Sequence, residues 1–168
     1  MMNVFMRYII AVLLLTMVSC MTEEELDMGS GLQVGDKLPA FSVVMSNGEK
    51  VESNDLLGNV SIIVFFNTAC KDCQQELPVI QRFYDSHSQY PLICISREES
   101  VSSVATYWEQ KGFTVPYSAQ EDRKIFELFA KSVVPRIYIV DEDGIIRYIF
   151  TDNPLATFDD LVEAIKTI

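Results

Sequence analysis

The stretch that decides the fold is residues 60–78, VSIIVFFNTACKDCQQELP. Its run of β-branched and aromatic residues at 60–66 predicts a strand, and the short polar stretch after it predicts a turn. A helical pattern then begins near Cys70 and continues to about Ser86, with Pro78 inside it. A proline at that place kinks a helix because it removes one backbone hydrogen bond. We therefore predict a strand that leads directly into a helix whose first turn carries two cysteines.

The position of these cysteines favours thiol chemistry. The first turn of a helix has unpaired N–H groups and a partial positive charge, so a cysteine there is more easily ionised to the nucleophilic thiolate. We expect Cys70 to be the attacking sulfur. Cys73 lies three residues further along the same face, where it can resolve a mixed disulfide on Cys70. Glu76 follows on that face, where a partly buried carboxylate with a raised pKa can take the proton from Cys73.

Two other roles for the cysteine pair are a zinc site and a structural disulfide. Zinc normally needs four ligands, but the other cysteines are Cys20 and Cys94, and His87 is the single histidine. Cys94 stands in an apolar strand, where we expect a small core residue, and His87 is expected at the surface. A disulfide across two residues closes a loop too small to restrain the chain much. A redox role is therefore preferred, and the lone histidine argues against a Cys/His/Asn hydrolase.

The segment CKDCQQELP at 70–78 resembles the CxxCxxExP pattern of the thioredoxin-like thiol:disulfide oxidoreductases of the TlpA and ResA type, which are related to the AhpC/TSA proteins. The resemblance extends from about residue 34 to the C-terminus. VGDKLPAF at 34–41 is similar to the opening segment of the family, and VVPRIYIVDEDGIIR at 133–147 is similar to its proline loop and following hairpin. The chain departs from the family at Ala69, where members usually carry Trp, and at Val134 and Arg136, where they often carry Thr. These departures concern substrate preference and redox potential more than the chemistry itself.

The resemblance implies roles that the residues alone leave open. By its place in the sequence, Pro135 is simply a loop proline at the start of a strand. By resemblance it is a cis proline beside the two cysteines, and the backbone of Val134 pairs with an extended substrate segment. The resemblance also implies a Cys70–Cys73 redox-active disulfide, with no metal and no bound organic cofactor. Protein disulfides would be the substrates and a membrane thiol carrier the electron donor, while a link to cytochrome c maturation would rest on analogy alone.

The rest of the chain alternates between strand and helix patterns. Asn47-Gly48 and Asp143-Gly144 are typical of hairpin turns. The expected elements are a hairpin from residue 41, strands at 92–96, 137–140 and 145–150, and helices at 100–112, 122–131 and 154–168. Together with the resemblance, this order predicts an α/β thioredoxin-like fold: a mixed central sheet flanked by helices on both faces, with an N-terminal β-hairpin extension. We expect Trp108, Phe126 and Phe129 in the core, and Glu98 and Glu99 in a solvated loop.

The N-terminus predicts export and anchoring. Residues 1–19 form a signal peptide pattern, because Arg7 precedes an apolar stretch at 8–18 that is too short to span a bilayer. MVSC at 17–20 resembles a bacterial lipobox, which would make Cys20 a lipidated first residue; an ordinary cleaved signal and an uncleaved anchor are the alternatives. Residues 20–33 are acidic and then flexible, which predicts a tether, and the acidic run also resembles the surface-export signal of some Gram-negative lipoproteins. Residues 34–168 then form one thioredoxin-like domain.

The formal net charge of -11 disfavours nucleic acid, whose binding depends on Lys and Arg. The sequence instead predicts an extracytoplasmic protein-disulfide reductase, lipid-anchored in the cell envelope on the periplasmic side or at the outer membrane surface. One alternative is a peroxiredoxin-like thiol peroxidase in which Cys70 attacks a peroxide, although Asn67 stands where peroxiredoxins typically place Thr or Ser. The other is a redox-inert lipoprotein that uses a thioredoxin fold as a binding module.

Overall fold

The structure, a computed structural model, describes residues 31–168. The predicted signal peptide at 1–19, the lipidation site Cys20 and the tether as far as residue 30 lie outside the described residues. Among residues 31–168, none of the helices combines the length and the apolar character needed to span a bilayer.

A mixed five-stranded sheet forms the centre of the domain, with the strand order β5-β4-β3-β6-β7. The strands are β3 (Ser61–Phe66), β4 (Leu92–Ser96), β5 (Tyr117–Ser118), β6 (Arg136–Val140) and β7 (Ile146–Phe150). Strand β3 pairs parallel with β4 and antiparallel with β6, so it occupies the middle of the sheet. All of its residues are buried, which explains why residues 62–66 are continuously apolar rather than alternating.

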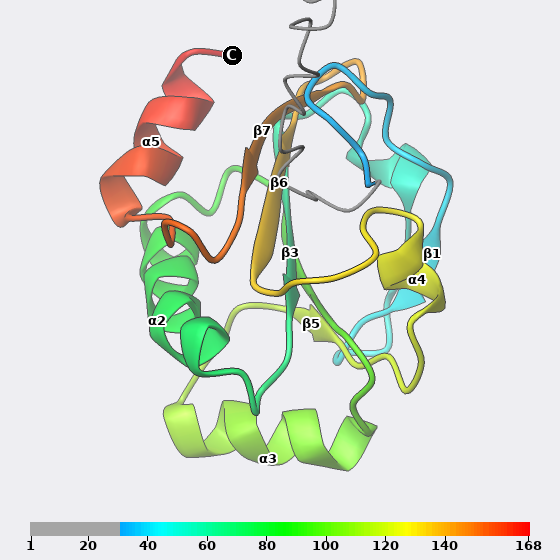
Figure 1. Ribbon diagram of the computed structural model, residues 1–168, viewed down its shortest axis with the longest axis vertical. Coiled ribbons are helices and arrows are strands. Elements are labelled where there is room, and N and C mark those ends of the chain that lie inside the picture. The colour runs from blue at the N-terminus through cyan, green and yellow to red at the C-terminus, as the bar shows by residue number, and fades with distance from the viewer. Residues whose placement is uncertain (1–30) are drawn as a thin grey trace, which may run out of the picture.

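Helices cover both faces of this sheet, as predicted (Figure 1). On one side, α2 (Lys71–Ser86) packs against α5 (Phe158–Lys166). The other side carries the short α4 (Lys124–Glu127) and the hairpin of β1 (Ser42–Val44) and β2 (Lys50–Glu52), while α3 (Val101–Lys111) crosses one end of the sheet. The 3-10 helix η1 (Ser53–Leu56) joins the hairpin to β3. The hairpin extension is confirmed as a separate two-stranded sheet.

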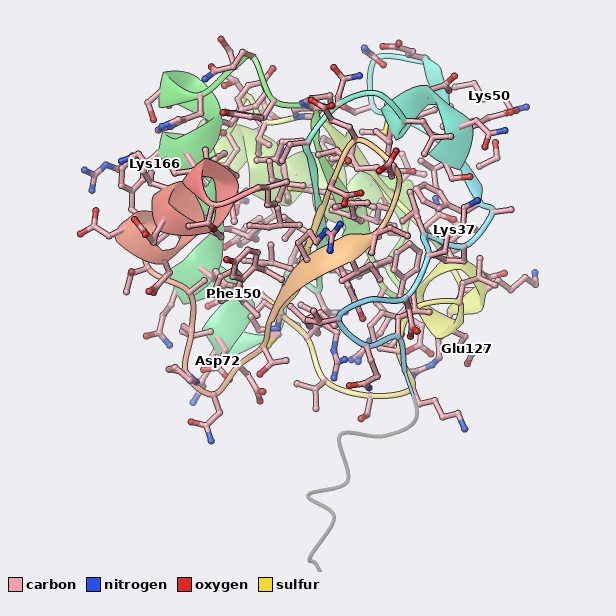
Figure 2. All side chains as sticks on the ribbon, turned by 90° about the horizontal axis from the view of Figure 1, so that it is seen from above. Lys37, Lys50, Asp72, Glu127, Phe150 and Lys166 are labelled. Carbon is pink, nitrogen blue, oxygen red and sulfur yellow. The ribbon has the colours of Figure 1, made fainter. Side chains whose placement is uncertain are left out.

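Aromatic side chains pack on both sides of β3. Phe65 faces the α4 side, where its ring centre lies 4.8 Å from that of Phe129 and 6.1 Å from that of Tyr138. Its neighbour Phe66 packs against Trp108 of α3, at 4.8 Å between ring centres. The expected burial of Trp108, Phe126 and Phe129 is confirmed. Figure 2 shows labelled charged side chains at the periphery of the domain, among them Lys50, Glu127 and Lys166.

Two predicted helices are shorter in the structure. The helix expected at 122–131 is a single turn, and Leu128, which follows it, is 42% exposed. Tertiary contacts explain why this helix is short, because the carbonyl of Phe129 accepts hydrogen bonds from the backbone N–H of Leu32 and from the hydroxyl of Tyr138. The C-terminal helix begins at Phe158 rather than at 154, since Thr157 caps it with a hydrogen bond from the backbone N–H of Asp160. The two-residue strand β5 was not predicted.

Candidate active site

The two cysteines of the CxxC motif differ sharply in their surroundings. Cys70 is the N-cap residue of α2 and is partly exposed, whereas Cys73, in the first turn, has no exposed surface. The sulfur of Cys73 accepts a hydrogen bond from the backbone N–H of Asn67, at 3.4 Å. Burial raises the pKa of the Cys73 thiol, and this hydrogen bond acts in the opposite direction. The outer sulfur is therefore accessible and the inner one is held protonated.

Cys70 contacts the proline loop that precedes β6. Its thiol donates a hydrogen bond to the carbonyl of Val134, at 3.4 Å between sulfur and oxygen. The Val134–Pro135 peptide bond is cis, as the family resemblance implied. Val134 is 6% exposed and belongs to the core, while its carbonyl oxygen faces the outer sulfur. The structure thus brings together two parts of the chain that are 64 residues apart.

Glu76 is buried on the same face of α2 as Cys73. Its side chain is 2% exposed, and its Oε1 accepts a hydrogen bond from the backbone N–H of Ala156, at 2.8 Å. Its Oε2 has no hydrogen-bond partner within residues 31–168. Burial raises the pKa of Glu76 to about 7, although the Ala156 N–H acts to lower it. The Glu76 charge in turn contributes to the raised pKa of Cys73, so the two groups are electrostatically coupled.

A carboxylate with this pKa can exchange protons near neutral pH. Its protonated and ionised forms are then both well populated, which is the condition for efficient general acid and base catalysis. A cavity of about 490 Å³ between α2 and α5 is bounded by Glu76 and Ala156. A carboxylate that is buried on the same helix face as Cys73 and has this pKa can act as a proton acceptor.

The loop between β3 and Cys70 is held in place by Glu99, a residue that we had wrongly expected in a solvated loop. Glu99 is 9% exposed and accepts hydrogen bonds from the backbone N–H of Thr68, at 2.8 Å, and from the Thr68 hydroxyl. The parallel pairing of Phe66 with Ser96 explains this contact, because the residues that follow two neighbouring parallel strands emerge at the same edge. That rule could have found Glu99 from the sequence. Glu98, by contrast, is exposed as expected.

Cys94 and the histidine, His87, pack against side chains of the core. Cys94 is fully buried in β4, which confirms it as a core residue, and this burial raises its pKa. His87 is the C-cap residue of α2, and its ring stacks on Phe83 with 4.6 Å between ring centres. Within residues 31–168, His, Cys, Asp and Glu side chains form no group of three or more that could hold a metal ion.

The profile of the AhpC/TSA family matches residues 34–149 of this chain. The chain belongs to the AhpC/TSA family. Among curated relatives, the thiol-disulfide oxidoreductase ResA of Bacillus thuringiensis is 27% identical over 115 residues, which cover 67% of this chain and 66% of that protein. The alignment thus spans just under two thirds of the relative's length. These matches confirm the predicted relationship to thioredoxin-like proteins of the ResA type.

Solved structures agree with the fold. The thioredoxin domain of a thiol-disulfide oxidoreductase from Bacteroides vulgatus superposes with a TM-score of 0.69 at 20% identity, covering 81% of this chain and 97% of that domain. The exposed lipoprotein thioredoxin Etrx1 from Streptococcus pneumoniae superposes with a TM-score of 0.67 at 14% identity, covering 77% of this chain and 100% of that one. The predicted thioredoxin-like fold is therefore confirmed.

Proposed function

We propose that this protein is a thiol:disulfide oxidoreductase that reduces disulfides in other proteins. The observation that carries the proposal is the asymmetry of the cysteine pair: Cys70 is accessible at the helix N-cap against the carbonyl of Val134, and Cys73 is buried behind it with a raised pKa. Such a pair separates the attacking sulfur from the resolving sulfur. Membership of the AhpC/TSA family and the similarity to ResA proteins support the same chemistry.

The reaction takes two exchange steps. The Cys70 thiolate attacks one sulfur of the substrate disulfide, the second substrate sulfur leaves as a thiolate, and a mixed disulfide forms on Cys70. Cys73 then transfers its proton to Glu76 and attacks the Cys70 sulfur. This forms the Cys70–Cys73 disulfide and releases, as a thiolate, the substrate sulfur that Cys70 had attacked. Two electrons have passed from the cysteine pair to the substrate, and the chemistry uses sulfur atoms without a metal or a bound organic cofactor.

The proline loop positions the substrate for the first step. The backbone of Val134 lies beside Cys70, where it can pair with an extended segment of the substrate in the manner of a sheet edge. The oxidised pair must afterwards receive two electrons from a dithiol donor. In our proposal this donor is a membrane thiol carrier.

Single cysteine variants test the proposal. Cys73→Ser should accumulate a mixed disulfide with a model protein substrate, because no second sulfur can release it, whereas Cys70→Ser should form none. Cys94→Ala serves as the control and should retain reductase activity. Full reductase activity of Cys70→Ser would contradict the proposal. A biological role that stays intact when both Cys70 and Cys73 are replaced with Ser would favour a redox-inert binding module. Rapid peroxide consumption that depends on Cys70 would favour the thiol peroxidase alternative.

The direction of electron flow is tested by the reduction potential of the Cys70/Cys73 pair, measured against glutathione and dithiothreitol buffers. A value near that of thioredoxin, about -270 mV, fits a reductant, whereas a value near about -120 mV would make the protein an oxidant. The second result would overturn the proposed direction but not the chemistry.

In the same proposal the domain works outside the cytoplasm, anchored through a lipid on Cys20. The lipobox-like MVSC at 17–20 supports this location, and one solved structure of the same fold is described as an exposed lipoprotein. Labelling of cells with a fatty acid should mark the wild-type protein and the Cys94→Ala control, and Cys20→Ser should abolish the label. An unlabelled wild-type protein would contradict the anchor.

A further inference from the structure

Directly after Pro135, Arg136 opens onto a cavity of about 420 Å³. One side of the cavity is formed by residues 32–34 of the N-terminal segment. The other side is formed by Ile149 of β7 and by Thr151 and Asn153, which follow β7. Thr151 and Asn153 add a hydroxyl and an amide that can donate hydrogen bonds. The cavity therefore combines a cation with neutral donors and an apolar wall.

Among residues 31–168, Arg136 is a buried charge without an anionic partner. Its side chain is 6% exposed, and its Nε has no hydrogen-bond partner within residues 31–168. No ion pair formed within these residues includes it, whereas Arg123 pairs with Glu98 and Arg147 pairs with Asp141. Removing a charge from water is unfavourable unless a partner compensates it. The formal net charge of the chain is -11, yet the buried Arg136 guanidinium has no ion-pair partner among residues 31–168. It is therefore a site that can bind a carboxylate.

Two of the chain segments that line the cavity continue to residues that contact Cys70 and Glu76. Arg136 lies two residues after Val134, whose carbonyl accepts a hydrogen bond from the Cys70 thiol. Thr151 and Asn153 lie on the segment that continues to Ala156, whose N–H binds Glu76. Along an extended chain, side chains two residues apart point to the same face and are about 7 Å apart. Consider a substrate whose cysteine is bound to Cys70 and whose neighbouring segment pairs with Val134. A side chain about two residues from that cysteine would then lie close to Arg136.

We propose that Arg136 and this cavity form a subsite for an acidic side chain, Asp or Glu, located about two residues from the reactive cysteine of the substrate. The subsite rests on the proposed reductase function and adds a substrate preference to it. A guanidinium binds a carboxylate through two parallel hydrogen bonds, and such charge-assisted bonds are stronger than neutral ones. The negative charge of the whole protein repels acidic segments, so a preference for them requires a local site of this kind.

Two model peptides test the subsite. Both carry the same disulfide and differ only in a Glu or a Gln two residues from the cysteine that Cys70 attacks. The reduced full-length protein, in detergent micelles, is mixed with each peptide, and kcat/KM for reduction is measured. We expect the wild type to prefer the Glu peptide by about tenfold, a preference that decreases with added salt. Arg136→Gln should lose this preference because kcat/KM falls for the Glu peptide alone. Arg136→Lys should retain part of the preference.

The Gln peptide is the internal control for folding, because its rate in Arg136→Gln should match that of the wild type. Lys166→Gln, at an exposed position on α5, controls for the change of net charge and should keep the tenfold preference. Equal rates for the two peptides with wild-type protein would overturn the subsite while leaving the reductase function intact. Reduction of neither peptide would instead overturn the proposed function.

The acidic residues of the chain's own tether, Glu23 to Glu25 and Asp27, are the competing carboxylates. Replacing all of them with their amides should leave the wild-type preference unchanged. If a preference for the Glu peptide appears only after this replacement, the tether carboxylates bind in the cavity of the wild-type protein. That result would overturn the substrate subsite.

Discussion

Replacing Glu76 with Gln should make the stability of the protein much less dependent on pH. The folded-state pKa of Glu76 is about 7, against an ordinary value of 4.5, because the side chain is buried. The folded protein therefore keeps this proton at pH values where the unfolded chain has lost it. The resulting stabilisation is fully present below about pH 4.5 and is lost as the pH rises through about 7.

The size of the effect follows from these two values. One pKa unit corresponds to about 1.4 kcal/mol, and integration between about pH 5 and about pH 8 gives a loss of about 2–3 kcal/mol in the free energy of unfolding. Gln stays neutral over this range and can still accept the hydrogen bond from Ala156. The free energy of unfolding of Glu76→Gln, relative to the wild type, should therefore rise by about 2–3 kcal/mol over the same interval.

Urea unfolding at several pH values between about 5 and 8 measures this difference. The matched control is Glu163→Gln, because Glu163 is an exposed glutamate on α5 that takes part in no ion pair within residues 31–168. Its pH profile should run parallel to that of the wild type. If the difference between Glu76→Gln and the wild type is the same at every pH, the raised pKa of Glu76 is refuted.

Three further predictions concern the site and the core. Glu76→Gln should slow resolution of the mixed disulfide by Cys73 by about 100-fold at pH 8, measured by rapid mixing, whereas an unchanged rate would exclude Glu76 as the proton acceptor. Glu99→Ala should lower the free energy of unfolding by about 1–3 kcal/mol, because it leaves a backbone N–H in the loop before the cysteines without a partner. Glu98→Ala, which removes an exposed carboxylate, should change it by less than about 1 kcal/mol in the same urea titration, and equal losses would contradict the assigned role of Glu99. Phe65→Ala should cost about 3–5 kcal/mol, and a loss below about 1 kcal/mol would show that its aromatic cluster does not stabilise the core.

Local signals in the sequence were sufficient for the elements around the motif. The strand at 61–66, the long helix through Pro78 and the strand at 92–96 all lie where the residue pattern placed them. The same holds for α3, whose N-cap is Ser100 and which ends at Gly112 in the left-handed conformation. These features depend on residues within about one helical turn of each other, so the chain encodes them directly.

The geometry of the site depends on the tertiary structure. The contact between Cys70 and Val134 spans 64 residues, and the bond from Ala156 to Glu76 spans 80. The order of strands in the sheet decides which distant loops meet at the end of β3, and no local pattern records that order. The sequence by itself determined that two cysteines open a helix after a buried strand. Only the fold decided that Glu76 is buried against the segment that leads into α5, that Glu99 supports the loop and that Arg136 is buried without an ion pair among residues 31–168, because burial and pairing arise from neighbours that are remote in the chain.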